Sequence, residues 1–196
     1  QLICTFQSNL QPMSIEFQKR LDSVTGHKES RQKQADEVLD NPELFQELIR
    51  LCFPTSNQNN SKACWVLELV CYEKLEWLED NLDFFCSNIK KLADDGAVRA
   101  ISKVCLLLTI AHFKKKEIVL TENQLQEITE TCFDWLINDT KVASKCYAIR
   151  ALHLLGNHFD WIHPELKIIL KKDYLNHSAA YQAVGREILK KINRQK

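Results

Sequence analysis

A short phrase recurs along this chain: a polar turn, then Lys or Arg, then a small or apolar residue, then an apolar helix. Its basic residues are Lys62, Arg99 and Lys145, which stand 37 and 46 positions apart, and a further step of 37 reaches Gln182. A period in this range is typical of stacked helix pairs, each too small to bury its own apolar face. The sequence therefore predicts an all-α array of antiparallel helix pairs, a right-handed α-solenoid.

The composition favours helices and limits the class of partner. Among the 196 residues only 4 Gly and 4 Pro occur, which leaves few turn residues for a fold of many strands. The 26 basic side chains balance the 26 acidic ones, whereas proteins that grip the nucleic-acid backbone usually carry a strong basic excess. We therefore expect another protein as the partner and not nucleic acid, although a local basic face is compatible with zero net charge.

Apolar runs and cysteines bear on the compartment in which the chain works. The longest uncharged run in its middle, residues 104–113, is far shorter than the roughly 20 residues of a spanning helix. Eight Cys without a signal peptide indicate a reducing compartment. Seven lie in apolar helical patterns, where we expect buried free thiols: Cys52, Cys64, Cys71, Cys86, Cys105, Cys132 and Cys146. These features predict a cytoplasmic protein without membrane contact, metal or cofactor.

Start signals and apolar spacing divide the chain into helix pairs. Pro42 and Pro164 are each followed by Glu, which suits the first turn of a helix. Two helices, near 14–24 and 28–40, are expected to cap the N-terminal end, and residues 1–13 to form a non-native or disordered leader. Four helix pairs are predicted over residues 41–193: 41–53 with 61–73, 75–92 with 97–113, 122–138 with 141–157, and 164–174 with 178–193.

Two tryptophans mark similar places in the array. Trp77 and Trp161 each follow a carboxylate, precede an aliphatic residue and stand five positions before a Leu. Their separation of 84 residues agrees within one residue with two steps of the basic phrase, 37 and 46. Since aromatic side chains dominate core burial, we expect both to be equivalent packing residues between repeats.

Residues 95–100 (DGAVRA) resemble the HEAT-repeat phrase, in which an Asp in the turn and an Arg opening the second helix form a polar ladder between repeats. Residues 139–146 (DTKVASKC) are a looser copy, and residues 60–63 (NSKA) carry Asn in place of the Asp. The resemblance extends over about residues 41–193. It implies a HEAT- or armadillo-like, non-catalytic scaffold that binds a macromolecule on its concave surface.

A second resemblance points to an enzyme. Residues 65–68 (WVLE), 132–137 (CFDWLI) and 160–166 (DWIHPEL) are similar to a group of short bacterial proteins labelled adenylosuccinate lyase. That label implies cleavage of adenylosuccinate to AMP and fumarate. The lyase superfamily carries a Ser-Ser-x-Met-Pro-x-Lys-x-Asn loop with the catalytic Ser, and this chain has no such run. The lyase is therefore an alternative function, and catalysis is not our main expectation.

The candidate binding residues lie on the second helices of the predicted pairs: Lys62, Trp65, Glu68, Arg99, Lys103 and Lys145. We expect the cations to form one row, which either binds an acidic peptide or a phosphate backbone, or pairs with carboxylates and joins the repeats. On one helix side, Trp65 and Glu68 also resemble the aromatic and acidic groups with which HEAT-like DNA glycosylases hold a damaged base. Nucleic-acid binding of that type is a third possible function.

Three histidines, a residue type that often binds metals, lie near the C-terminal end. His153, His158 and His163 are spaced by five, so they diverge by about 140° around a helix of 3.6 residues per turn. Helical zinc sites use ligands at i and i+4. We therefore predict no zinc site there, and we expect His163, which precedes Pro164, to lie at a helix start.

Overall fold

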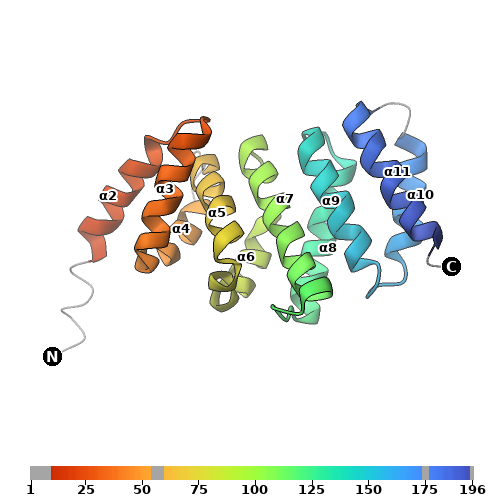
Figure 1. Cartoon of the computed structure of the whole chain (residues 1–196), viewed down its shortest axis with the longest axis horizontal. Helices are drawn as coiled ribbons and strands as arrows, with labels where there is room; N and C mark the ends of the chain where they lie inside the picture. The colour runs from red at the N-terminus through yellow and green to blue at the C-terminus, as the bar shows by residue number, and fades with distance from the viewer. Residues whose placement is uncertain (1–9, 54–59, 174–176, 195–196) are drawn as a thin grey trace.

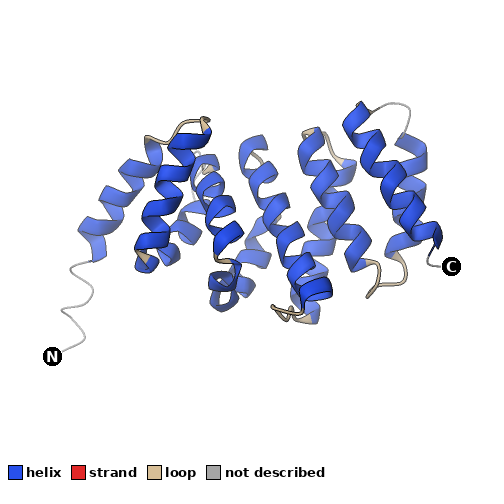
Figure 2. Ribbon diagram, viewed as in Figure 1, coloured by secondary structure: helices blue, strands red, loops and turns tan. Residues whose placement is uncertain are grey.

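The computed structural model describes residues 10–53, 60–173 and 177–194, and these residues form helices and no strand (Figure 2). The predicted leader lies largely outside the described residues, and residues 10–13 begin the first helix. In chain order the elements are α2 (Leu10–Asp22), α3 (Lys28–Asp40), η1 (Pro42–Leu44), α4 (Phe45–Cys52), α5 (Ser61–Glu73), η2 (Leu75–Asn81), α6 (Leu82–Ile89), α7 (Asp95–Ile110), η3 (Ala111–Lys115), α8 (Glu122–Ile137), α9 (Val142–Leu155), α10 (Ile162–Asp173) and α11 (Ala179–Arg194).

The helices stand in two layers that run along the length of the molecule (Figure 1). In the layer nearer the viewer, α3, α5, α7, α9 and α11 follow one another, and each contacts the next. Behind them lie α4, α6, α8 and α10. Within the pairs, α4 contacts α5, α8 contacts α9, and α10 contacts α11. The predicted all-α repeat fold is confirmed.

The predicted helix 75–92 differs from the observed structure. Its first part is a 3-10 segment, η2, and only Leu82–Ile89 is α-helical. In a 3-10 helix the side chains at i and i+3 lie above one another, so Leu75 and Leu78 both pack against the core. Burial of these two leucines is compatible with the tighter helix.

The central helix α7 is enclosed by α5 and α9 in its own layer. A helix packed on several sides needs apolar residues around most of its circumference, and Ile101, Val104 and Leu108 of α7 are fully buried. The continuous helix Asp95–Lys115 has 21 residues and is apolar enough to cross a membrane by length and composition. A core helix has the same composition, and 56% of the apolar window is buried. The absence of membrane contact stays a prediction.

Local capping explains where two helices begin. The Asp94 carboxylate precedes α7 and accepts hydrogen bonds from the backbone N–H groups of Gly96 at 2.9 Å and Ala97 at 3.1 Å. It also accepts from the hydroxyl of Ser61 at the start of α5. This bond to Ser61 is the main reason that the pKa of Asp94 is lowered, and the backbone bonds add to it. Thr121 caps α8 in a reciprocal capping box with Gln124.

The two matched tryptophans have different environments. Trp77 is half-buried and its ring meets that of Phe45 edge-on at 5.5 Å. Trp161 is 54% exposed and stacks on Phe133 at 5.4 Å. The prediction of equivalent packing residues is therefore wrong for Trp161. The residues that follow them, Leu78 and Ile162, are both fully buried, so the apolar anchor of each segment is the aliphatic neighbour.

The seven cysteines predicted to be buried free thiols are buried and free in the structure. Burial raises the pKa of Cys86 and of Cys132 to about 12, and only the thiolate is nucleophilic. We expect these thiols to react slowly with an aromatic disulfide reagent in the native protein, and all eight of the chain to react in denaturant without reductant. A titration that finds fewer than eight thiols in denaturant would show that disulfides had formed.

Candidate binding surface

Glu68 of α5 is the centre of an ion cluster between two neighbouring repeats. Its side chain is 6% exposed, and the Nη2 atom of Arg99 lies 2.7 Å from Oε2. The Nζ atom of Lys103 lies 3.3 Å from Oε1. Arg99 and Lys103 share one side of α7 because they stand four residues apart. Two cations therefore meet one carboxylate, and the cluster carries an excess positive charge.

Lys103 also lies between two tyrosine rings. Its Nζ atom is 4.5 Å from the ring centroid of Tyr72 on α5 and 5.5 Å from that of Tyr147 on α9. An ammonium at such a distance is attracted to the negative face of the ring. Tyr72 is 47% exposed, so this arrangement reaches the surface and links α5, α7 and α9.

Trp65 continues the cluster towards the N-terminal end. The guanidinium carbon of Arg31 on α3 lies 5.9 Å from the centroid of the half-buried Trp65 ring. The indole Nε1 donates a hydrogen bond to the carbonyl of Gly96 at 3.2 Å. A Cβ atom at Gly96 would lie 3.1 Å from a Trp65 ring carbon, so glycine allows this close approach between α5 and α7.

A second ion cluster lies towards the C-terminal end, one helical turn beyond Tyr147. The carboxylate of Glu187 on α11 pairs with two cations. Its Oε2 atom lies 3.3 Å from Nη2 of Arg150 on α9, and its Oε1 atom lies 2.6 Å from Nζ of Lys191. The hydrogen bond from Lys191 is the main reason that the pKa of Glu187 is lowered, and Arg150 adds to it. We name the connected surface the basic–aromatic band; its residues are Arg31, Trp65, Glu68, Tyr72, Arg99, Lys103, Tyr147, Arg150, Glu187 and Lys191.

Lys62 and Lys145 do not join Arg99 in one row, so the prediction of a single row is wrong. The Nζ atom of Lys62 donates to the carbonyl of Asp22 at the end of α2. Lys145 is 6% exposed, and its Nζ donates to the carbonyls of Leu136 at 2.8 Å and Asn138 at 2.7 Å. Lys145 therefore satisfies carbonyls at the C-terminal end of α8 and is not available on the surface.

The register of α5 against α7 explains the error for Lys62. Helices α5 and α7 begin at Ser61 and Asp95, which are 34 positions apart, whereas the sequence phrase matched residues 37 apart. At the offset of 34, buried and partly exposed positions coincide over residues 62–71 and 96–105. Trp65 is thus the counterpart of Arg99. A shift of three residues is close to one helical turn, so the apolar pattern alone does not separate the two registers.

The predicted Asp–Arg ladder is also replaced by other pairs. Asp95 pairs with Lys141 at 3.3 Å on the exposed surface, and not with Arg99. Glu68, Arg99 and Lys103 were predicted as binding residues from the sequence, whereas Tyr72 and Tyr147 were not. The spacing of Tyr147 and Arg150 at i and i+3 on one helix was the available signal.

Comparison with known families agrees with this architecture. A family model described as HEAT repeat domain matches residues 17–192. The chain belongs to the HEAT repeat domain family. A search of curated proteins found no match, and neither did a search of solved structures. As a HEAT repeat protein the chain is a helical-repeat scaffold of a kind generally involved in protein interaction. The match includes α3, which lies N-terminal to the four predicted pairs.

Replacing Lys145 by methionine should test its structural role. The variant keeps most of the side-chain volume but leaves the carbonyls of Leu136 and Asn138 without this donor, so we expect a loss of about 1–3 kcal/mol in the free energy of unfolding. Lys141→Met is the control: the Lys141 side chain is 71% exposed, and surface changes usually stay within about ±0.5 kcal/mol. Equal urea midpoints for the two variants would contradict the assignment.

Proposed function

We propose that this HEAT repeat protein is a non-catalytic scaffold that binds an acidic segment of another protein along the basic–aromatic band. The observation that carries the proposal is the repeated excess of cations over carboxylates. Glu68 meets Arg99 and Lys103, and Glu187 meets Arg150 and Lys191. An acidic partner complements both clusters, and complementary charge gives specificity and fast association.

The side chains of the band are held in place before a partner binds. Lys103 is fixed by one carboxylate and two rings, yet its side chain is still 24% exposed. Arg99 is 30% exposed. Side chains that are already ordered lose less conformational entropy on binding. Tyr, Trp and Arg, which the band combines, are the residues enriched at the centres of protein interfaces.

The contacts of Glu68 favour a scaffold over a base-excision enzyme. The glycosylase-type alternative depends on Glu68 as its acidic group, but both carboxylate oxygens are occupied by cations and the side chain is 6% exposed. The lyase alternative rests on the sequence resemblance alone. We place the scaffold in the cytoplasm, since its free thiols are typical of a reducing compartment.

Fluorescence anisotropy with a labelled oligoglutamate peptide would test the proposal, with a single-stranded oligonucleotide of equal charge as the competing probe. We expect the peptide to bind more tightly, and binding to weaken with salt because exposed charges are screened. The double variant Lys103→Glu/Arg150→Glu should weaken peptide binding by about tenfold or more, since like charges then face the probe.

A matched control variant changes the net charge by the same amount, but on α10, which belongs to the layer of helices behind the band. Lys171 and Lys172 are exposed on α10, so Lys171→Glu/Lys172→Glu should weaken binding much less. Equal losses in both double variants would show that the protein attracts the peptide by net charge and not through the band. Tighter binding of the oligonucleotide would favour a nucleic-acid partner.

A further inference from the structure

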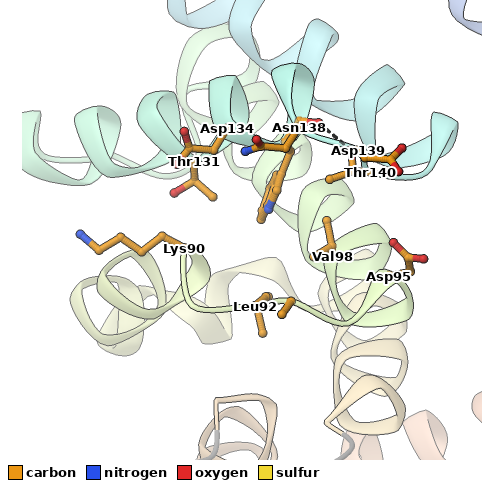
Figure 3. A pocket seen from close by; sticks show the side chains of 11 residues that line it. Lys90, Leu92, Asp95, Val98, Thr131, Asp134, Asn138, Asp139 and Thr140 are labelled. Carbon is orange, nitrogen blue, oxygen red and sulfur yellow. Dashed lines mark hydrogen bonds between the residues drawn. The ribbon is translucent and has the colours of Figure 1, made fainter. Parts of the chain in front are cut away.

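A pocket of about 240 Å³ opens between two neighbouring repeats, away from the band. The turn between α6 and α7 forms one wall, and the C-terminal end of α8 with the turn that follows forms the other (Figure 3). Drug-sized ligands usually occupy pockets of about 300–1,000 Å³. This smaller pocket suits a single side chain.

Thr131 supplies a polar atom that has no partner inside this pocket. It lies on α8, is 1% exposed, and its Oγ1 atom is buried without a hydrogen bond. Figure 3 shows its side chain pointing from α8 across the pocket towards the turn that carries Leu92. Buried hydroxyl groups are nearly always hydrogen-bonded, so the unpaired hydroxyl of Thr131 can accept a hydrogen bond from a group that enters the pocket.

The walls and the rim differ in polarity. Leu92, Val98 and the buried ring of Trp135 form apolar parts of the lining. Three carboxylates also line it, those of Asp95, Asp134 and Asp139.

The lysines near the pocket do not cancel the negative charge of its carboxylates. One cation, Lys90, belongs to the lining, and its ammonium is 3.3 Å from a carboxylate oxygen of Glu127. Lys141 pairs with Asp95 from outside the pocket at 3.3 Å. When these two pairing partners, Lys141 and Glu127, are counted with the lining residues, four carboxylates face two ammonium groups. The pocket therefore attracts cations.

We propose that this pocket binds an arginine side chain of a partner protein. The apolar walls would contact the methylene groups and one face of the guanidinium, and the carboxylates of Asp134 and Asp139 would accept its N–H groups. One remaining N–H would donate to the unpaired Oγ1 of Thr131. Arginine fits better than lysine because its planar guanidinium has donors in several directions and is more weakly hydrated. The site is separate from the band, which attracts anions.

Nuclear magnetic resonance titration of the full chain can test this site. The probe is N-acetyl-arginine methylamide, and its control is the citrulline analogue, which has nearly the same shape but no charge. We expect the arginine probe to shift the amide signals of Leu92, Val98 and Thr131, and the citrulline probe to bind at least about tenfold more weakly, because hydrogen bonds to charged groups are the stronger ones.

Two variants separate the pocket from a general effect on folding. Thr131→Val removes the unpaired hydroxyl with little change in shape and should weaken arginine binding by about tenfold. Thr129→Val is the control on the same helix: Thr129 is 1% exposed, but its hydroxyl donates to the carbonyl of Leu125 at 2.7 Å. This control should bind the probe as the wild type does. Lys103→Glu/Arg150→Glu should also retain binding, which distinguishes this proposal from the function of the band.

The exposed rim provides a test that does not depend on the core. Asp134 and Asp139 are exposed, so Asp134→Asn/Asp139→Asn should fold normally and weaken arginine binding by about tenfold. The proposal is overturned if arginine and citrulline probes shift the same signals equally, if the shifts lie away from Thr131, or if the wild type and the rim variant bind with equal affinity.

Discussion

Replacing Ile101 by alanine is expected to lower the free energy of unfolding by about 2–5 kcal/mol. Ile101 is fully buried on α7, which packs against α5 on one side and α9 on the other. The lost methyl and methylene groups leave a cavity at the centre of the array. In a repeat protein, stability is approximately a sum of repeat and nearest-neighbour terms, so a cavity in α7 weakens both of its interfaces.

Chemical denaturation measures this loss directly. Ile168→Ala on α10 is the control, because Ile168 is 60% exposed and exposed positions usually change stability by no more than about 0.5 kcal/mol. If Ile101→Ala cost less than the control, α7 would not be the central packed helix of the array. A decrease in the denaturant slope of Ile101→Ala would indicate that the two halves then unfold separately.

The stability of the protein should fall between pH 6.5 and pH 4 because of His153. Its side chain is 9% exposed, and burial, followed by the nearby His163, Lys191 and Lys114, lowers its pKa to about 4. Between these pH values the unfolded chain binds a proton at His153 and the folded chain does not. Stability therefore decreases as the pH falls. We expect the free energy of unfolding to be about 2 kcal/mol lower at pH 4 than above pH 6.5. This loss is smaller than the full pKa shift would give, because solvent at the edge of the site screens the charge.

The surroundings of His153 show why this imidazole stays neutral. Its ring stacks on that of His163 at 5.4 Å, and its Nδ1 atom has no hydrogen-bond partner. The Nε2 atom of His163 lies 2.9 Å from the carbonyl oxygen of His153. A Cβ atom at Gly156 would lie 2.2 Å from the His163 ring, so the stack also requires glycine there. Glu187 is the carboxylate that opposes the lowering of the pKa.

His153→Phe keeps an aromatic ring in the stack and removes the titrating group. Urea unfolding of this variant and of the wild type at several pH values should show a flatter dependence for the variant between pH 6.5 and pH 4. His27→Gln changes an exposed histidine and should keep the slope of the wild type. A variant His153→Phe that loses as much stability in acid as the wild type would assign the loss to other groups.

Helix positions and buried apolar residues could be predicted because their signals are local. A capping side chain bonds to N–H groups only a few residues away, so Thr121 marks the start of α8 without any tertiary contact. Regular apolar spacing identifies the face that must be buried. These local signals predicted the helix pairs and the buried cysteines.

The candidate site was only partly predictable. Arg99 was predicted from the recurring phrase, and Glu68 and Lys103 were predicted on the same second helices; the three side chains meet in the structure. The tyrosines that flank Lys103 come from α5 and α9. No pattern within one helix predicts that these rings contact the Lys103 ammonium. Trp161 fits an apolar pattern, yet it is 54% exposed because the neighbouring Ile162 occupies the core.

By itself the sequence determined the all-α repeat, its family and most helix starts, since these depend on periodicity and on contacts within a few residues. The tertiary structure alone decided which charges meet. Glu68 and Arg99 lie 31 positions apart, and their contact depends on the relative height of α5 and α7. A register shifted by about one turn preserves the apolar pattern along a helix but changes every polar partner across it. Lys145 also matched the basic phrase, yet its ammonium bonds to carbonyls at the end of α8 beneath the surface, a contact that the phrase does not encode.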